Sequence, residues 1–215
     1  MSTFNPKPDP DKSSLKKRVN QLRQGLQGAD PYVLASRTEA DFHPDPGEFR
    51  LQLWEQDIVV TYPELVARDL ASGKELGLDV QALLLYHFTT SKGVPLSGRW
   101  ISFSELPDGK FYNSAFQGYT GGELKRAFNN DRQAFERATE SAGGKREELG
   151  DASFSFRALP RIWLLTVYWE GDEDFPASVQ VLFDASVVHH LPTDVCAILG
   201  SMLTRRIIRA GREIK

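Results

Sequence analysis

The sequence predicts an α+β domain in which a largely antiparallel sheet is flanked by about four helices. Strand-like segments come in groups and do not alternate singly with helices, which favours antiparallel pairing. Segments 12–27 and 192–208 carry apolar residues at helical spacing. At 215 residues, 40% of them hydrophobic, the chain is long enough for one ordinary core. We therefore expect a disordered N-terminal arm over 1–11, where three prolines prevent regular structure, and a single domain over 12–215.

The first third of the chain is predicted to form one helix and a β-hairpin. Residues 12–27 carry a narrow apolar stripe, typical of a helix that lies across its own domain or across a partner. Alternating patterns over 48–54 and 57–62 predict the hairpin, and 65–70 fits either a third strand or a short helix. The stripe consists of Leu15, Val19, Leu22 and Leu26.

The middle of the chain is predicted to hold two helices and a short strand. Apolar residues after Asp79, the expected N-cap, predict a central helix. A short aromatic strand is expected over 99–103, followed by a turn at 107–109. Residues 123–138 predict a second amphipathic helix.

The last third predicts a three-stranded meander and a closing helix. Segments 153–158, 162–169 and 179–183 are rich in β-branched and aromatic residues and are separated by turns. Pro192 then begins a helix that runs to about Ile208. Together these elements indicate an antiparallel sheet packed against helices.

Several classes of function are disfavoured by what the sequence lacks. The glycine spacings of the common nucleotide-binding loops are absent, as are a Gly-x-Ser-x-Gly elbow, a His-Glu-x-x-His helix and an EF-hand loop. Cys196, the single cysteine, cannot form an intrachain disulfide or a four-cysteine metal site. On the apolar stripe of its helix, it is expected to be a buried hydrophobe and not a nucleophile.

Charge and hydropathy set the expected location and partners. No apolar run approaches the length of a membrane span and no signal peptide is visible, so we predict a cytoplasmic protein without membrane contact. Residues 1–23 and 205–215 each carry a net charge of +4 on an acidic body of −11. Because the body is acidic and its aromatic residues are not interleaved with Lys or Arg, nucleic-acid binding is disfavoured.

Residues 86–112 are the strongest candidate for a small-molecule pocket. They place polar groups among aromatic and apolar neighbours, which is typical of ligand sites and equally of the edge of a core. Either Arg99 or Arg161 could hold an anionic group on a ligand. Arg161 could instead pair with Asp184 across neighbouring strands. The predicted ligand-binding residues are His87, Arg99, Trp100, Glu105, Tyr112, Arg161 and Asp184.

No metal site is predicted. His189 and His190, if they lie on a strand, point to opposite faces and cannot share a metal ion. The acidic residues at 172–174, which with Asp184 and a histidine could bind a divalent ion, are more typical of a solvated turn.

Four blocks of the sequence carry a family resemblance. They are LLLYHF at 83–88, GVPLSGRWISFSELPDGKFYNSAF at 93–116, GDASFSFRALPRIWLLTVYW at 150–169 and DEDFPASVQVLFDASVVHHLPTDV at 172–195. Together they resemble the prokaryotic domain-of-unknown-function family numbered 3786, from about residue 30 onward. Some members are joined to cysteine-rich iron–sulfur modules, which implies redox or corrinoid-linked metabolism, and this chain has no such module. The family's polar positions correspond here to His87, Trp100, Glu105, Tyr112, Asp151, Arg161, Glu173 and Asp184.

Three hypotheses of function follow, and the cofactor is unknown under each. The first is a non-catalytic accessory or ligand-binding domain with its pocket in 86–112. The second is an enzyme in which Glu105 or Asp184 acts as general base with His87. The third is a homodimeric interaction protein whose first helix packs across its partner.

Overall fold

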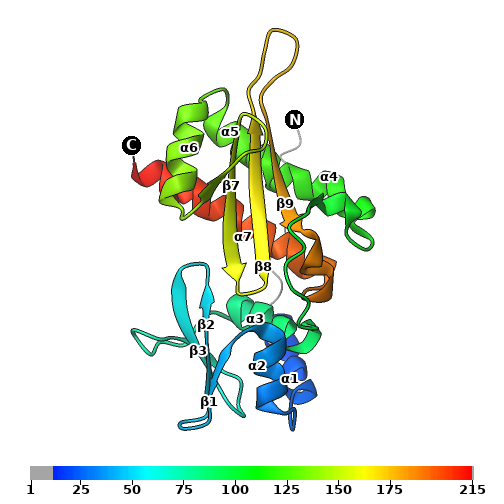
Figure 1. Cartoon of the computed structure of the whole chain (residues 1–215), viewed down its shortest axis with the longest axis vertical. Coiled ribbons are helices and arrows are strands. Elements are labelled where there is room, and N and C mark those ends of the chain that lie inside the picture. Colours follow the sequence, from blue (N-terminus) through cyan, green and yellow to red (C-terminus); the bar gives the residue numbers. More distant parts are fainter. Residues whose placement is uncertain (1–11, 215) are drawn as a thin grey trace.

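The chain folds into two antiparallel sheets with helices packed against them (Figure 1). The computed structural model describes residues 12–214. The α+β class is confirmed, and the structure divides the antiparallel strands between two sheets. The predicted arm, 1–11, lies outside the described residues. Among the helices of residues 12–214, none combines the length and apolarity needed to cross a bilayer.

The N-terminal part holds the smaller sheet, in the order β1-β2-β3-β4. The predicted hairpin is confirmed as β2 and β3, and 65–70 contributes a short strand, β4. Along the chain, α2 precedes this sheet and α3 follows it. The elements are α1 (Lys12–Gly25), α2 (Pro31–Thr38), β1 (Asp41–His43), β2 (Glu48–Leu53), β3 (Gln56–Thr61), β4 (Ala67–Asp69) and α3 (Leu78–Thr90).

The C-terminal part holds the larger sheet, in the order β5-β9-β8-β7-β6. The predicted meander is confirmed as β7, β8 and β9, and the predicted closing helix as α7. The elements are β5 (Trp100–Ser102), η1 (Phe103–Glu105), α4 (Gly109–Tyr119), α5 (Gly121–Phe128), α6 (Arg132–Ser141), β6 (Lys145–Glu147), β7 (Ala152–Leu159), β8 (Ile162–Trp169), β9 (Ser178–Asp184), η2 (Ala185–His189) and α7 (Thr193–Glu213).

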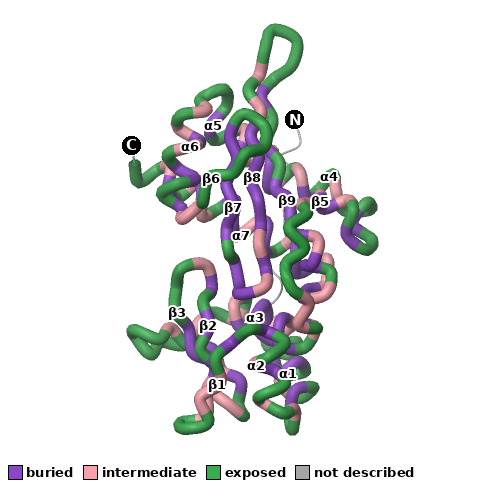
Figure 2. Tube along the Cα trace, viewed as in Figure 1, coloured by how far each residue is buried: buried purple, intermediate pink, exposed green. Residues whose placement is uncertain are grey.

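Aromatic packing joins the larger sheet to its helices. Phe135 of α6 stacks on Tyr168 of β8 at a ring-centroid distance of 5.1 Å, and Phe116 of α4 lies 5.9 Å from Phe183 of β9. Figure 1 shows α7 running behind the strands, and Figure 2 shows the strands buried along most of their length. Burial of such large side chains is the main source of stability here.

Helix α1 packs on α3 of its own chain. Val19, Leu22 and Leu26 of its stripe are buried, and the guanidinium of Arg18 donates a hydrogen bond of 2.7 Å to the hydroxyl of Tyr86. The stripe is therefore covered within the chain and is not available to a partner. Helix α1 therefore does not support the predicted homodimer.

Several elements differ from the sequence prediction. Helix α4 follows the expected turn at 107–109, in a segment where no element was predicted, and the helix expected over 123–138 is broken into α5 and α6 at Asn129, whose φ is +47°. Asp131 then caps α6 by accepting from the backbone N–H of Ala134. The N-cap of α3 is Gly77, and Asp79 lies in the first turn.

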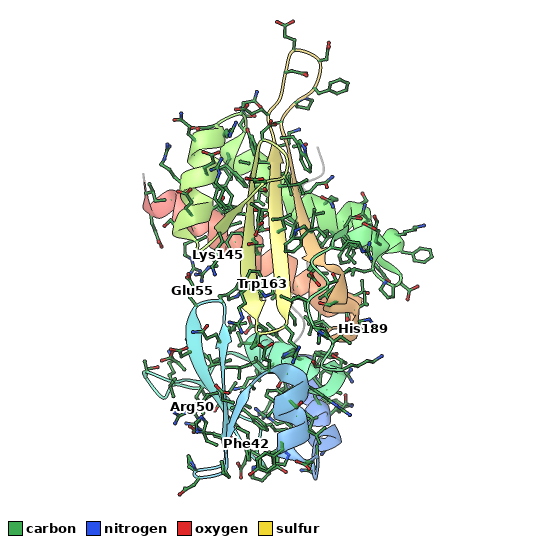
Figure 3. All side chains as sticks on the ribbon, viewed as in Figure 1. Phe42, Arg50, Glu55, Lys145, Trp163 and His189 are labelled. Carbon is green, nitrogen blue, oxygen red and sulfur yellow. The ribbon has the colours of Figure 1, made fainter. Side chains whose placement is uncertain are left out.

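The two parts meet at the turn ends of their hairpins. The backbone N–H of Trp54 donates to the carbonyl of Ala158 at 2.8 Å. Beside it, Glu55, labelled in Figure 3, forms a 2.7 Å ion pair with Arg206 of α7. These contacts fix the smaller sheet against the larger one.

Candidate functional site

An open groove of about 560 Å³, lined largely by polar residues, lies where the larger sheet meets α4 and α5. Strand β5 pairs with β9 only over Leu182–Asp184, so residues 178–180 of β9 lie beyond the end of β5. Helices α4 and α5 and the segment after β5 flank this stretch of β9, which pairs with β8 along its other edge. The volume is within the range of small-molecule sites.

Three serines contribute hydroxyl groups to the groove: Ser102, Ser104 and Ser178. Ser102 begins η1, and its backbone N–H and hydroxyl both donate to the carboxylate of Glu105, at 2.7 and 2.9 Å. These two bonds lower the pKa of Glu105. The hydroxyl of Ser104 lies 2.8 Å from that of Ser102 and donates to it, since Ser102 uses its proton on Glu105. Glu105 therefore holds the serine wall in place.

Three amides and a lysine complete the polar lining: Asn113, Gln117, Gln180 and Lys125. The Oδ1 atom of Asn113 is buried and has no hydrogen-bond partner. Within residues 12–214, the side chains of Gln117, Gln180 and Lys125 also make no hydrogen bond or ion pair. Lys125 is half-buried, whereas every other lysine whose side chain the structure describes is exposed.

Glycines shape the helical wall. A Cβ atom at Gly121 would collide with the carbonyl oxygen of Val179, so α5 can approach β9 only with glycine there. Gly118 and Gly122 also line the groove and leave it open. Helix packing therefore explains Gly121, and these glycines do not form one of the common phosphate loops.

Sequence patterns did not point to most of the residues that line this groove. Of the lining residues, Ser102 lies on the predicted strand and Ser104 just after it, both inside the predicted segment 86–112. The side-chain amides of α4 could not be placed on a common face, because that helix was not predicted. Four-residue spacing from Asn113 through Gln117 to Gly121 was the one available signal of a shared helical face.

Residues 30–206 match the family described as "Domain of unknown function (DUF3786)". The chain belongs to this family. The match includes every residue of the groove and excludes α1. Neither a curated protein nor a solved structure matched the chain.

Asp184 of the DUF3786 domain is a buried structural carboxylate. One oxygen accepts from the hydroxyl and backbone N–H of both Ser97 and Ser186, and the other accepts from the N–H of Gly98. Burial alone would raise its pKa, but these hydrogen bonds outweigh that effect and lower it. The carboxylate therefore fastens the loop before β5 to the end of β9.

His87 and His190 lie together where α3 meets η2. Their ring centroids are 6.2 Å apart and both side chains are fully buried. His190 contacts the hydroxyl of Ser91 at 2.8 Å and the carbonyl of Val94 at 2.9 Å. Backbone groups near His87 are not aligned for a hydrogen bond with its ring, and burial lowers its pKa to about 3.

The two predicted arginines occupy different environments. Arg161, at the β7–β8 turn, pairs with Glu39 at 3.7 Å, so the suggested pair with Asp184 is wrong because Asp184 is fully engaged by loop donors. Arg99 is exposed, and its carbonyl accepts from the N–H of Ala185.

The remaining predicted residues also lie outside the groove lining. Trp100 packs against Leu165, Val167 and Leu182 on the sheet face opposite Phe183, and Tyr112 is 66% exposed. Asp151 accepts from the N–H of Glu170 in a turn. No hydrogen bond in the described chain joins His87 to Glu105 or Asp184. The predicted binding roles of these residues are untested.

Cys196 and the adjacent His189 and His190 lie in different parts of the fold. Cys196 is buried, and burial raises the pKa of its thiol. His189, labelled in Figure 3, lies in the 3₁₀ helix η2 and not on a strand, because the chain turns after Asp184. Within residues 12–214, no three His, Cys, Asp or Glu side chains are grouped to hold a metal ion.

Proposed function

We propose that this DUF3786 domain binds a small polar ligand in the groove between β9 and helices α4 and α5. One observation carries the proposal: polar side chains converge on a groove of ligand size while their hydrogen-bonding capacity stays unused. Gln117, Gln180 and Lys125 are the clearest cases, because within residues 12–214 no other side chain or backbone group pairs with their side chains.

The composition of the lining favours binding over catalysis. The lining that residues 12–214 provide contains no histidine, cysteine or carboxylate. General acid–base catalysis depends on such groups close to the reacting atoms. The absence of aromatic side chains from the same lining also argues for a compact polar ligand and against a stacked aromatic ring.

The experiment compares wild type with a variant whose groove is filled. Gln180 is exposed on β9, so Gln180→Trp should occupy the groove without disturbing the core. Arg157→Trp, at an exposed position of β7, is the matched control. Native mass spectrometry of gently purified protein should show a mass excess in wild type and control that the Gln180 variant lacks.

Two results would overturn the proposal. One is a mass excess that Gln180→Trp retains in full, because the ligand would then bind elsewhere. The other is a clean mass for all three proteins, together with no NMR shift at groove amides in a panel of sugars, polyols and amino acids.

Three further predictions rest on the sequence alone: a cytoplasmic location, a homodimer and a prokaryotic source. For the homodimer, the mass of the native protein in the same experiment is the test. An apparent mass of one chain would end that prediction.

A further inference from the structure

Lys125 is the one charged residue in the lining that residues 12–214 provide. The other lining side chains are serines, amides, glycines and one valine. Nearby carboxylates are directed elsewhere: Glu105 accepts from Ser102, and Glu123 pairs with Arg126 at 3.9 Å. The described lining therefore carries one positive charge, on Lys125, and no carboxylate.

The position of Lys125 is unusual within this chain. Lysine side chains normally keep their ammonium groups in water, and the other six that the structure describes are exposed. Lys125 alone is half-buried, and among residues 12–214 no carboxylate pairs with it. A cation at the wall of a groove, without a counter-ion among the described residues, provides a place for an anion.

We propose that the ligand of this groove is a small hydroxylated anion, whose negative group pairs with Lys125 and whose hydroxyls bond with the side-chain amides of Gln117 and Gln180. The inference rests on the proposed function and specifies its ligand class. The hydroxyl of Ser178 and the amide of Gln180 supply further donors around the same anion. Phosphate and carboxylate share this chemistry, so the probes must separate them.

Three probes with one carbon skeleton isolate the charge: glycerol, glycerate and glycerol 3-phosphate. Each is titrated into ¹⁵N-labelled full chain, and shifts of the backbone amides of Gly121, Gly122 and Lys125 are followed. We expect both anions to shift these amides and glycerol to shift them little. The stronger of the two identifies carboxylate or phosphate as the preferred group.

Lys125→Met and Lys110→Met form the matched pair of variants. Lys110 is an exposed lysine of α4 outside the groove lining, so its loss controls for net charge. Removing one charged hydrogen bond should weaken anion binding about tenfold or more in Lys125→Met. The Lys110 variant should bind as wild type does. An unchanged spectrum of core amides establishes that each variant is folded.

The outcomes separate this inference from the proposed function. Equal binding of glycerol and the two anions, or equal affinity in both lysine variants, overturns the anionic ligand and leaves a neutral polar ligand standing. Absence of groove shifts with all three probes and with inorganic phosphate, up to tens of millimolar, also overturns it. The proposed function is then decided by the mass measurement on Gln180→Trp.

Discussion

The groove differs from the loop contacts of Asp184 and His190 in how far hydrogen-bonding groups are used. Asp184 accepts from five donors, and both ring nitrogens of His190 have partners. In the groove, Asn113, Gln117 and Lys125 have none among the described residues. Satisfied polar groups hold loops to the sheet. Unsatisfied ones at a cavity leave capacity for a ligand.

The comparison also explains why residue type alone did not point to the groove. Histidine, aspartate and arginine have more versatile chemistry than glutamine or asparagine, so they were the natural candidates. In the folded chain, Asp184 is committed to Ser97, Gly98 and Ser186, and Glu105 to Ser102. Their chemistry is used in building the fold.

Replacing Asp184 should give the largest loss of stability. Asp184→Ala leaves the N–H groups of Ser97, Gly98 and the buried Ser186 without this acceptor and should lower the free energy of unfolding by about 3 kcal/mol. Urea denaturation followed by circular dichroism measures this. Asp41→Ala, at an exposed position of β1, is the control, expected within about 0.5 kcal/mol of wild type. Equal losses in both variants would mean that the Asp184 network contributes nothing.

Protonation of His87 should give the next largest effect. Its pKa is about 3 in the folded chain and near 6.5 when unfolded, so the unfolded chain binds the proton first as the pH falls. The stabilising contribution of neutral His87 is therefore complete above about pH 6.5 and declines toward pH 3, by about 1.4 kcal/mol per pH unit.

Urea denaturation at several pH values between 6 and 4 tests this effect. The free energy of unfolding should fall less steeply in His87→Leu than in wild type, because the leucine does not titrate. His43→Leu, at a half-buried position of β1, provides the matched histidine-to-leucine control. Parallel slopes for wild type and His87→Leu would show that His87 is not held neutral by burial.

Sequence patterns predicted the larger sheet well because each strand carries its own signal. Segment 162–169 is rich in β-branched and aromatic residues, and β8 has those bounds. Helix α4 carries no such signal. Its sequence, GKFYNSAFQGY, contains two glycines and a single fully buried aromatic residue, Phe116. Stacking of Phe116 on Phe103, at 4.1 Å, stabilises it through the tertiary structure.

The groove could not be predicted from the sequence for a related reason. Its walls come from Ser102, from α4 and α5, and from Gln180, which lies far along the chain. Only folding brings β9 beside α5, and the close approach depends on Gly121 meeting Val179. Whether an amide such as Asn113 finds a partner is a property of the folded neighbourhood and not of its sequence context.

The smallest effect on stability is expected inside the groove, where it sharpens the contrast with Asp184. Gln180→Ala removes an exposed amide that makes no hydrogen bond to the described residues, so the free energy of unfolding should stay within about 0.5 kcal/mol of wild type. The same variant should weaken binding of the best glycerol-derived anion by a few fold, because one neutral hydrogen bond is lost. Denaturation and NMR titration on one sample measure both quantities. A loss of stability as large as that of Asp184→Ala, with binding unchanged, would identify Gln180 as part of the framework and remove the distinction between the two clusters.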